Sequence, residues 1–201
     1  MASPADRAGC VPADPAAIRR AADLLRAGEL VIVPTETVYG VAARADSPAA
    51  LAKLCAAKGR DEAKRIAFFA ANLAAVRATG AQVDEIAARL AAAFWPGPLT
   101  LVLPNGAGGW DGFRCPDHPV AQAWLRELAG VVPAVTSANR SGQPPALTAP
   151  DRLHGASFPG CAAVIRLVRR SRGSSRRRDP GRPWTCRGQS RCRCGPPCLL
   201  S

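Results

Sequence analysis

A four-residue apolar run that stops at a proline most constrains how this chain can fold. Residues Leu30–Val33 read L-V-I-V, a short β-branched run typical of a buried strand. Pro34 cannot continue a central strand ladder, so the strand must end there. A hydroxyl-rich segment, Thr35–Gly40, follows directly. We therefore expect polar side chains just past the carboxyl end of a strand, which is where open α/β sheets bind ligands.

Two interpretations of this polar segment stay open from the residues alone. If the chain remains extended, Thr35, Thr37 and Tyr39 point to one side and Glu36 to the other, because side chains alternate along a strand. Two hydroxyls and a phenol would then lie together in a ligand site. Alternatively, the segment is an ordinary turn whose hydroxyl groups bond their own backbone.

Helical and strand patterns alternate along the chain to about residue 165, which predicts an α/β domain. Proline follows a helix-capping residue at Asp14-Pro15 and at Ser47-Pro48, and His118-Pro119 also resembles a helix start. A glycine-rich loop is expected over residues 105–112. The predicted helices cover residues 15–27, 48–57, 74–79, 83–94, 119–128 and 149–153, and the predicted strands cover residues 30–33, 66–70, 99–103, 113–115, 131–135 and 162–168.

Charge and cysteine content divide the chain near residue 165. The net charge is +12, of which residues 166–201 carry +10 through 11 arginines and one acid. We divide the chain into a flexible arm (1–13), a folded domain (14–165) and a basic Arg/Cys-rich tail (166–201), which lacks apolar periodicity and should be disordered. The cysteines before residue 166 are scattered along the sequence, which suggests reduced thiols rather than a disulfide framework.

The sequence shows no membrane span or secretory signal, so we expect a cytoplasmic protein.

Three explanations of the tail remain open. Its Arg, Gly, Pro, Ser and Cys content is typical of GC-rich codons read out of frame, and we expect a frameshifted ending. It could instead be a basic RNA-binding segment. Zinc binding is a third alternative, although the spacing of the four tail cysteines lacks the paired C-x2-C pattern of structural sites.

Five short motifs stand along the chain: Pro34–Gly40 (P-T-E-T-V-Y-G), Lys58–Arg60 (K-G-R), Phe94–Thr100 (F-W-P-G-P-L-T), Arg114–Pro119 (R-C-P-D-H-P) and Ser137–Gly142 (S-A-N-R-S-G). In their order and spacing they resemble the YrdC-like family of threonylcarbamoyl-AMP synthases. The resemblance covers roughly residues 14–165. It implies a twisted open sheet of mixed strand direction, flanked by helices, with one concave basic face that holds the substrates.

The activity implied by this resemblance is that of a nucleotidyltransferase. L-threonine, bicarbonate and ATP, with Mg²⁺ accompanying the ATP, would give threonylcarbamoyl-AMP and pyrophosphate. The product would supply the tRNA threonylcarbamoyl-transferase machinery, and tRNA or double-stranded RNA is a further candidate partner. No prosthetic group, metal ligand or side-chain nucleophile is expected. Three negatively charged groups would have to be held together, which requires fixed positive charge and many donors.

The resemblance also assigns site residues. Threonine would be bound by Thr37, Arg114 and Ser137, with Thr35 and Tyr39 as neighbours, and ATP by Lys58, Arg60, Lys64 and Asn139. Structural alternatives exist: the basic residues could simply complete a helix, Arg114 could be a surface arginine, and S-A-N could be a turn.

Two departures from the family pattern support an alternative function. Asp61, Lys64, Arg65 and Phe69 stand where the family usually has Pro, an Asn-Pro pair and a histidine, and the Ser-Thr-Val segment expected after residue 165 is not visible. The alternative is a catalytically impaired YrdC-like protein that binds RNA.

Overall fold

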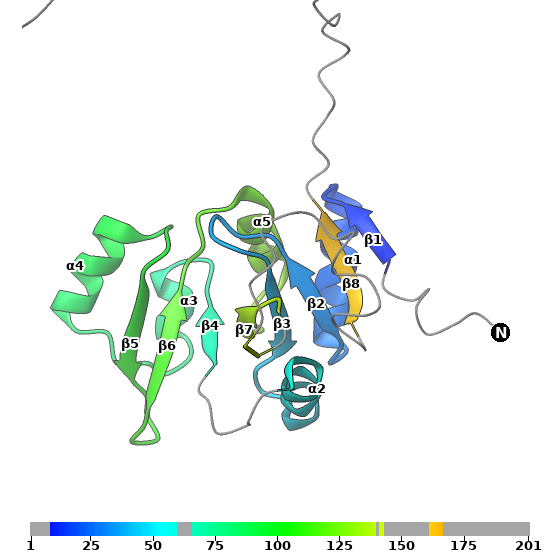
Figure 1. Cartoon of the computed structure of the whole chain (residues 1–201). Helices are drawn as coiled ribbons and strands as arrows, with labels where there is room; N and C mark the ends of the chain where they lie inside the picture. The colour runs from blue at the N-terminus through cyan, green and yellow to red at the C-terminus, as the bar shows by residue number, and fades with distance from the viewer. Residues whose placement is uncertain (1–8, 60–65, 140, 143–160, 167–201) are drawn as a thin grey trace, which may run out of the picture. The chain divides into compact units, whose positions relative to one another are not determined.

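The computed structural model describes residues 9–59, 66–139, 141–142 and 161–166 (Figure 1). Among these residues it contains five helices and one eight-stranded sheet. Predictions for Arg60, Lys64, the helix at residues 149–153 and the tail lie outside the described residues. The helices are α1 (Pro15–Arg26), α2 (Pro48–Lys58), α3 (Leu73–Arg77), α4 (Glu85–Phe94) and α5 (Pro119–Glu127).

The sheet is open and of mixed strand direction, as the family resemblance implied. Its strand order is β1-β8-β2-β3-β7-β4-β6-β5. Strands β1, β8 and β2 run parallel, as do β4 and β6, whereas the other neighbouring pairs are antiparallel. The strands are β1 (Gly9–Pro12), β2 (Leu30–Val33), β3 (Gly40–Arg44), β4 (Ala67–Phe69), β5 (Thr100–Pro104), β6 (Trp110–Arg114), β7 (Pro133–Ser137) and β8 (Cys161–Arg166).

Helices α1 and α2 begin at the positions predicted from their capping residues, Asp14 and Ser47. The Asp14 carboxylate accepts a hydrogen bond from the Ala17 N–H at 2.8 Å, and the Ser47 hydroxyl accepts one from the Ala50 N–H at 3.3 Å. Each side chain satisfies a backbone donor that the first helical turn leaves without a partner. Gly59 ends α2 with φ +59°, a left-handed conformation that glycine adopts without strain. None of the described helices is long and apolar enough to cross a membrane.

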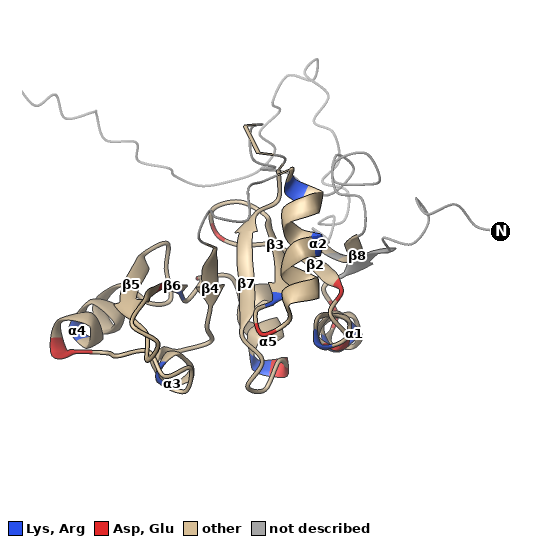
Figure 2. Ribbon diagram, turned by 90° about the horizontal axis from the view of Figure 1, so that it is seen from below, with Lys and Arg blue, Asp and Glu red and all other residues tan. Residues whose placement is uncertain are grey.

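Strand β2 is apolar throughout because both of its faces are covered. Val31 and Val33 pack with Leu25 of α1 and with Trp124 of α5, whereas Leu30 and Ile32 belong to a second cluster that includes residues of α2. Figure 2 shows α1, α2 and α5 beside this half of the sheet, with α4 at the other end. The segment after β2 is therefore held by a rigid, doubly covered strand.

Three strand predictions were wrong or incomplete. Residues 9–12, expected to be part of a loose arm, form β1 beside β8. Gly40–Arg44 was not predicted as a strand, yet it forms β3 between β2 and β7. The loop expected over 105–112 is shorter, because β6 begins at Trp110 and pairs with β5. In the first two cases a partner distant in sequence, β8 or β7, stabilises a segment whose own pattern is weak.

Candidate functional site

The candidate site lies where the β2–β3 loop meets the ends of β7, β4 and β6. Strand pairing brings these segments together: Gly40 pairs with Ser137, and Phe69 pairs with Arg114. Glycine is needed at position 40, because a Cβ atom there would lie 2.7 Å from Cγ1 of Val135. This close approach places the Thr35–Gly40 loop against β7, although β2 and β7 are not neighbours, because β3 lies between them.

A pocket of about 150 Å³ opens at this junction, which we call the junction pocket. Sites for drug-sized ligands are larger, about 300–1,000 Å³. The junction pocket therefore suits a molecule of amino-acid size rather than a whole nucleotide. It is lined by Thr35, Thr37, Val38, Gly40, Ala67, Phe69, Thr100, Arg114, Val135, Thr136 and Ser137.

Arg114 is the charged centre of the junction pocket. Its Nη2 donates to Oε1 of Glu36 at 2.5 Å and to Oγ1 of Thr37 at 2.9 Å. The guanidinium carbon lies 5.8 Å from the centroid of the Phe69 ring, close enough for a cation–π contact. The Arg114 side chain is only 15% exposed, so the hypothesis of a simple surface arginine is wrong.

One donor of Arg114 is left over. Its Nε is buried and has no hydrogen-bond partner among the described residues. A buried donor without a partner is costly, and a guanidinium presents its donors in a planar fork that fits a carboxylate. Arg114 therefore has the capacity to hold an additional anionic group beside Thr37.

The two threonine hydroxyls have different roles. The Thr35 hydroxyl donates to the Val38 carbonyl at 2.6 Å and accepts from the Thr37 and Val38 N–H groups, so it organises its own turn. Its oxygen lies 3.0 Å from the Thr37 hydroxyl, which in turn faces Arg114. The turn interpretation is thus confirmed for Thr35. Thr35 and Thr37 also line the junction pocket, and ligand binding there stays a prediction.

Two orientations expected in this segment were wrong. Tyr39 is buried among residues of the α2 cluster, including Leu54 and Ala57, and is not among the residues that line the junction pocket. Glu36, expected to point away from the threonines, bonds the same guanidinium group as Thr37. The alternation of an extended strand does not apply here, because the Thr35 hydroxyl folds the chain into a turn.

Lys58 and Ser137 form a second polar contact beside the junction pocket. Lys58 is 5% exposed, and its Nζ donates to the Ser137 carbonyl at 2.6 Å and to its hydroxyl at 3.3 Å. Asn139 follows two residues later, and its N–H donates to the Ser137 carbonyl at 2.9 Å. The structure thus brings Lys58 and Asn139 to the same end of β7. Their proposed roles toward ATP stay predictions.

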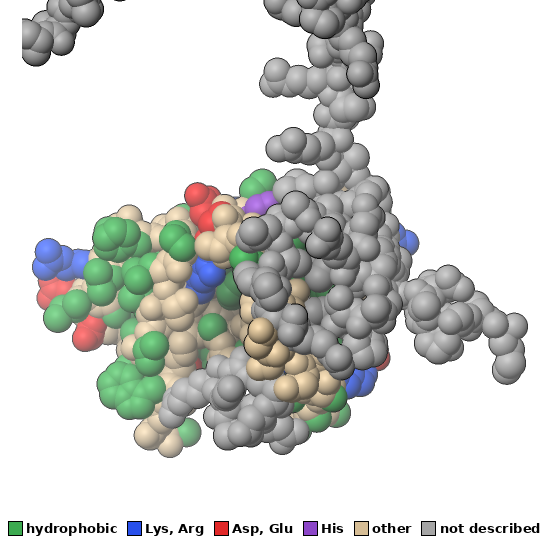
Figure 3. All heavy atoms as spheres, in the orientation of Figure 1, with side chains coloured by type: hydrophobic (Ala, Val, Ile, Leu, Met, Phe, Trp, Pro, Cys, Tyr) green, Lys and Arg blue, Asp and Glu red, His purple; other side chains and the backbone are tan. Residues whose placement is uncertain are grey.

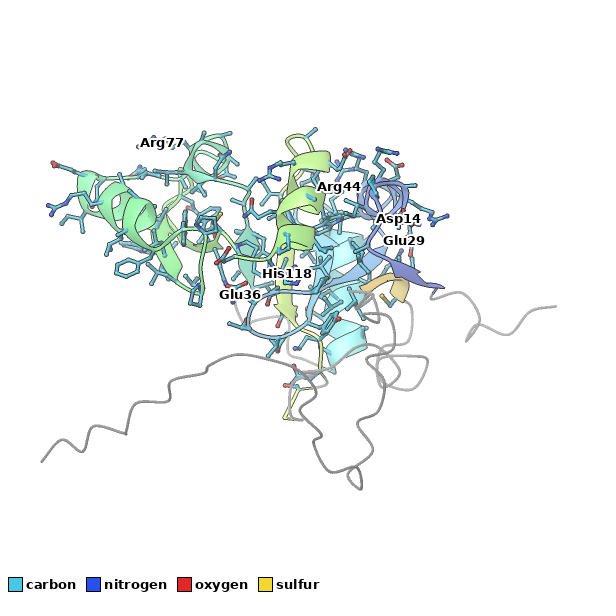
Figure 4. The ribbon with its side chains drawn as sticks, turned by 90° about the horizontal axis from the view of Figure 1, so that it is seen from above. Asp14, Glu29, Glu36, Arg44, Arg77 and His118 are labelled. Atoms are coloured by element: carbon cyan, nitrogen blue, oxygen red, sulfur yellow. The ribbon has the colours of Figure 1, made fainter. Side chains whose placement is uncertain are left out.

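His118 begins α5, as the helix-start interpretation predicted. Its Nδ1 accepts a hydrogen bond from the Val120 N–H at 3.3 Å. Burial lowers the pKa of His118, and the nearby carboxylates of Glu36 and Asp117 oppose this shift. Figure 4 shows Glu36 and His118 close to each other. Since a buried neutral imidazole is a weak anion ligand, Arg114 is the cation that lines the junction pocket among the described residues.

Sequence reasoning did not assign Thr100 or Glu36 to the site. Thr100 was expected only as part of a strand over residues 99–103, but it pairs with Arg114 across β5 and β6 and lines the junction pocket. Only the strand register could have identified Thr100. Glu36 does not line the pocket but bonds Arg114, and its carboxylate beside the two threonines was the available signal for an ion pair with an arginine.

The fold defines the class of protein: an α/β domain with an open mixed sheet and a small pocket, lined by Arg114, at the carboxyl end of β2. A family model, Sua5/YciO/YrdC, described as "Telomere recombination", matches residues 23–159. The chain belongs to this family.

Relatives and solved structures agree with the assignment. A threonylcarbamoyl-AMP synthase of Bacillus subtilis (strain 168) is 39% identical over 137 residues, which cover 63% of this chain and 39% of the relative. The Pyrococcus abyssi (strain GE5 / Orsay) enzyme of the same name is 40% identical over 136 residues, which cover 63% of this chain and 40% of the relative. The matched segment is thus about two fifths of the length of these relatives.

A crystal structure of P. abyssi Sua5 complexed with L-threonine superposes on this chain with a TM-score of 0.70 and 32% identity, covering 77% of this chain and 47% of that one. Escherichia coli YciO superposes with a TM-score of 0.68, 21% identity and coverage of 77% and 79%, which shows a shared fold. The predicted fold class is confirmed.

Proposed function

We propose that this chain is an L-threonylcarbamoyladenylate synthase. It would convert L-threonine, bicarbonate and ATP into threonylcarbamoyl-AMP and pyrophosphate, for the threonylcarbamoyl modification of tRNA. The observation that carries the proposal is the convergence of Arg114 and Thr37 in a small pocket, where one buried guanidinium donor has no partner in the described part of the chain. The names of the relatives support the same activity.

In this proposal the threonine carboxylate binds the guanidinium of Arg114 and takes the place of Glu36. Two-point binding of a carboxylate by a guanidinium fixes both position and orientation. The Thr37 and Ser137 hydroxyls then bond the remaining polar groups of the substrate. Phe69, which lines the junction pocket, packs against the threonine methyl group. A histidine at that position would add a hydrogen bond that Phe69 cannot supply.

The nucleotide belongs to the side of the junction pocket where α2 ends. Lys58 is held against Ser137, and Arg60 and Lys64 follow in sequence. Positive charge here would neutralise the ATP phosphates, which arrive with Mg²⁺ as part of the substrate. The chain's contribution would be positioning and electrostatic stabilisation, with no covalent intermediate on the protein.

The test is pyrophosphate release from ATP by the purified full chain, with Mg²⁺ and bicarbonate, in the presence and absence of L-threonine. We expect release to require both threonine and bicarbonate. Valine, which has the shape of threonine without its hydroxyl, is the matched control substrate. Pyrophosphate release that does not depend on threonine, or no pyrophosphate release at all, would contradict the proposal. Salt-dependent RNA binding in the absence of pyrophosphate release would instead support the impaired RNA-binding alternative.

Replacing Arg60 with alanine is expected to weaken ATP binding about tenfold, because a charge-assisted phosphate contact is lost. The fold should persist, since the change lies beyond the last residue of α2 and its cap at Gly59. Calorimetric titration with ATP measures the effect, and circular dichroism checks the fold. The control is Arg77→Ala, which removes an exposed arginine on α3. Equal ATP affinity in Arg60→Ala and wild type would remove Arg60 from the nucleotide site.

A further inference from the structure

The large exposed apolar side chains of the described residues all lie at one end of the sheet. Ile86, Leu90 and Phe94 of α4 are 69%, 38% and 55% exposed, and Val102 and Trp110 on β5 and β6 are 60% and 53% exposed. Figure 3 shows hydrophobic side chains gathered over this end of the molecule. Monomeric proteins rarely expose a contiguous apolar patch of more than a few hundred Å².

All of these side chains except Phe94 line a groove of about 680 Å³ between α4 and β5, which we call the edge groove. Helix α4 packs on the core through its small residues Ala87 and Ala91, so its larger apolar side chains are exposed on the opposite face. Leu90 and Val102 both line the edge groove, and β5 is the last strand of the sheet in the described part of the chain.

The outer edge of β5 has backbone groups that face away from the sheet. The Pro104 carbonyl accepts from the Gln82 N–H at 2.8 Å, and proline has no N–H to give to β6, so Pro104 faces outward. Backbone direction alternates along an antiparallel strand. Therefore Val102 and Thr100 also direct their N–H and C=O groups outward, while Leu101 and Leu103 pair with β6.

Natural edge strands usually carry charges or prolines that prevent pairing between molecules. Residues Thr100–Pro104 (T-L-V-L-P) carry no charge, and their single proline stands at the last position, two residues after Val102. The five exposed apolar side chains offer on the order of 600 Å² per copy, close to the roughly 800 Å² that each partner buries in a standard interface. The area is thus of the size that a stable dimer requires.

We propose that the edge groove binds a second copy of this chain through a two-fold axis beside Val102. The axis would pair β5 with the partner's β5 in antiparallel fashion, so that the Val102 N–H and C=O of each copy bond those of the other. It would also lay α4 against α4, with Leu90 against Leu90 and Ile86 against Phe94, because these residues are evenly spaced about Leu90. A surface that is complementary to itself under one rotation forms a closed dimer.

The self-complementarity distinguishes a second copy from an unrelated partner. Gln82 already bonds the edge of β5 at Pro104, so a foreign strand could use the outward backbone groups of Val102 and Thr100, but it would leave the apolar stripe of α4 in water. A foreign helix could cover that stripe but would leave the Val102 backbone groups without a partner strand. One two-fold axis satisfies both surfaces at once, since Leu90 and Val102 share the edge groove.

The proposal is tested by sedimentation of the full chain, under reducing conditions, over a wide concentration range. We expect a monomer–dimer equilibrium whose dissociation constant rises at least about tenfold in Leu90→Glu and in Val102→Pro. Leu90→Glu places a charge in the apolar stripe, and Val102→Pro removes the outward N–H while leaving the bonds to β6. The control is Ala74→Glu, which adds the same charge at an exposed position of α3.

Amide hydrogen exchange locates the interface independently. The Val102 amide should become more protected as the protein concentration rises, while threonine-dependent pyrophosphate release by Leu90→Glu should stay unchanged because α4 does not line the junction pocket. A wild-type protein that is monomeric at all concentrations would overturn the proposal. So would a dimer that neither variant weakens, or whose formation leaves the Val102 amide unprotected.

Discussion

Replacing Arg114 with lysine is expected to weaken L-threonine binding by about 1.5–3 kcal/mol, roughly 10- to 150-fold. Lysine keeps the positive charge but loses the planar fork that holds a carboxylate at two points. It also loses the broad contact of the guanidinium with the Phe69 ring. Calorimetric titration with L-threonine measures the change. The effect should appear mainly in threonine affinity, with ATP affinity preserved.

Arg44 provides a matched control for this substitution. Its Nε and Nη2 hold the two carboxylate oxygens of Asp46 at 2.5 and 2.9 Å, and neither residue lines the junction pocket. Arg44→Lys thus makes the same chemical change at a guanidinium–carboxylate pair elsewhere. Its threonine affinity should match that of the wild type. If Arg114→Lys also bound threonine normally, Arg114 would not be the carboxylate anchor.

Replacing Trp124 with alanine is expected to lower the free energy of unfolding by about 3–5 kcal/mol. Trp124 is the largest fully buried side chain in the described part of the chain, and it packs in the cluster that joins α1 and α5 to β2, β3 and β7. Truncation leaves a cavity that the helices cannot fill without moving off the sheet. Urea unfolding followed by circular dichroism measures the loss.

Trp124→Phe separates volume from polarity at the same position. The Trp124 indole N–H is buried and has no hydrogen-bond partner among the described residues. Phenylalanine keeps most of the apolar volume and removes this donor, which costs about 1–3 kcal/mol when buried without a partner. The phenylalanine variant should therefore be much closer to the wild type than the alanine variant. Equal losses in both would mean that packing around the indole dominates completely.

Local signals were sufficient for most of the helices. Asp14, Ser47 and His118 cap helices as predicted, and a buried strand occupies Leu30–Val33. The missed strands, β1 and β3, are defined by long-range partners rather than by their own periodicity. The helix predicted over residues 83–94 is present as α4, but its periodicity could not reveal that Ile86, Leu90 and Phe94 face outward while Ala87 and Ala91 face the core.

The site was predictable to the extent that it depends on motif residues. Thr37, Arg114 and Ser137 lie around one pocket, as expected from their resemblance to the family motifs. Glu36 bonds Arg114 and Tyr39 is buried because the Thr35 hydroxyl folds the segment into a turn. Thr100 lies in the pocket because of the register between β5 and β6. Neither is encoded in a short sequence window, so these features required the folded chain.

The position of β8 has a consequence for how the protein is made. This strand lies between β1 and β2, and its Cys161 is 131 positions after Leu30, to whose carbonyl its thiol donates. While the chain is being synthesised, β2 must wait for one of its two neighbours until residues 161–166 have emerged. Pairing over such a separation closes slowly and leaves a strand edge exposed in the meantime. The nascent chain should therefore be most vulnerable to aggregation just before its last described strand is added.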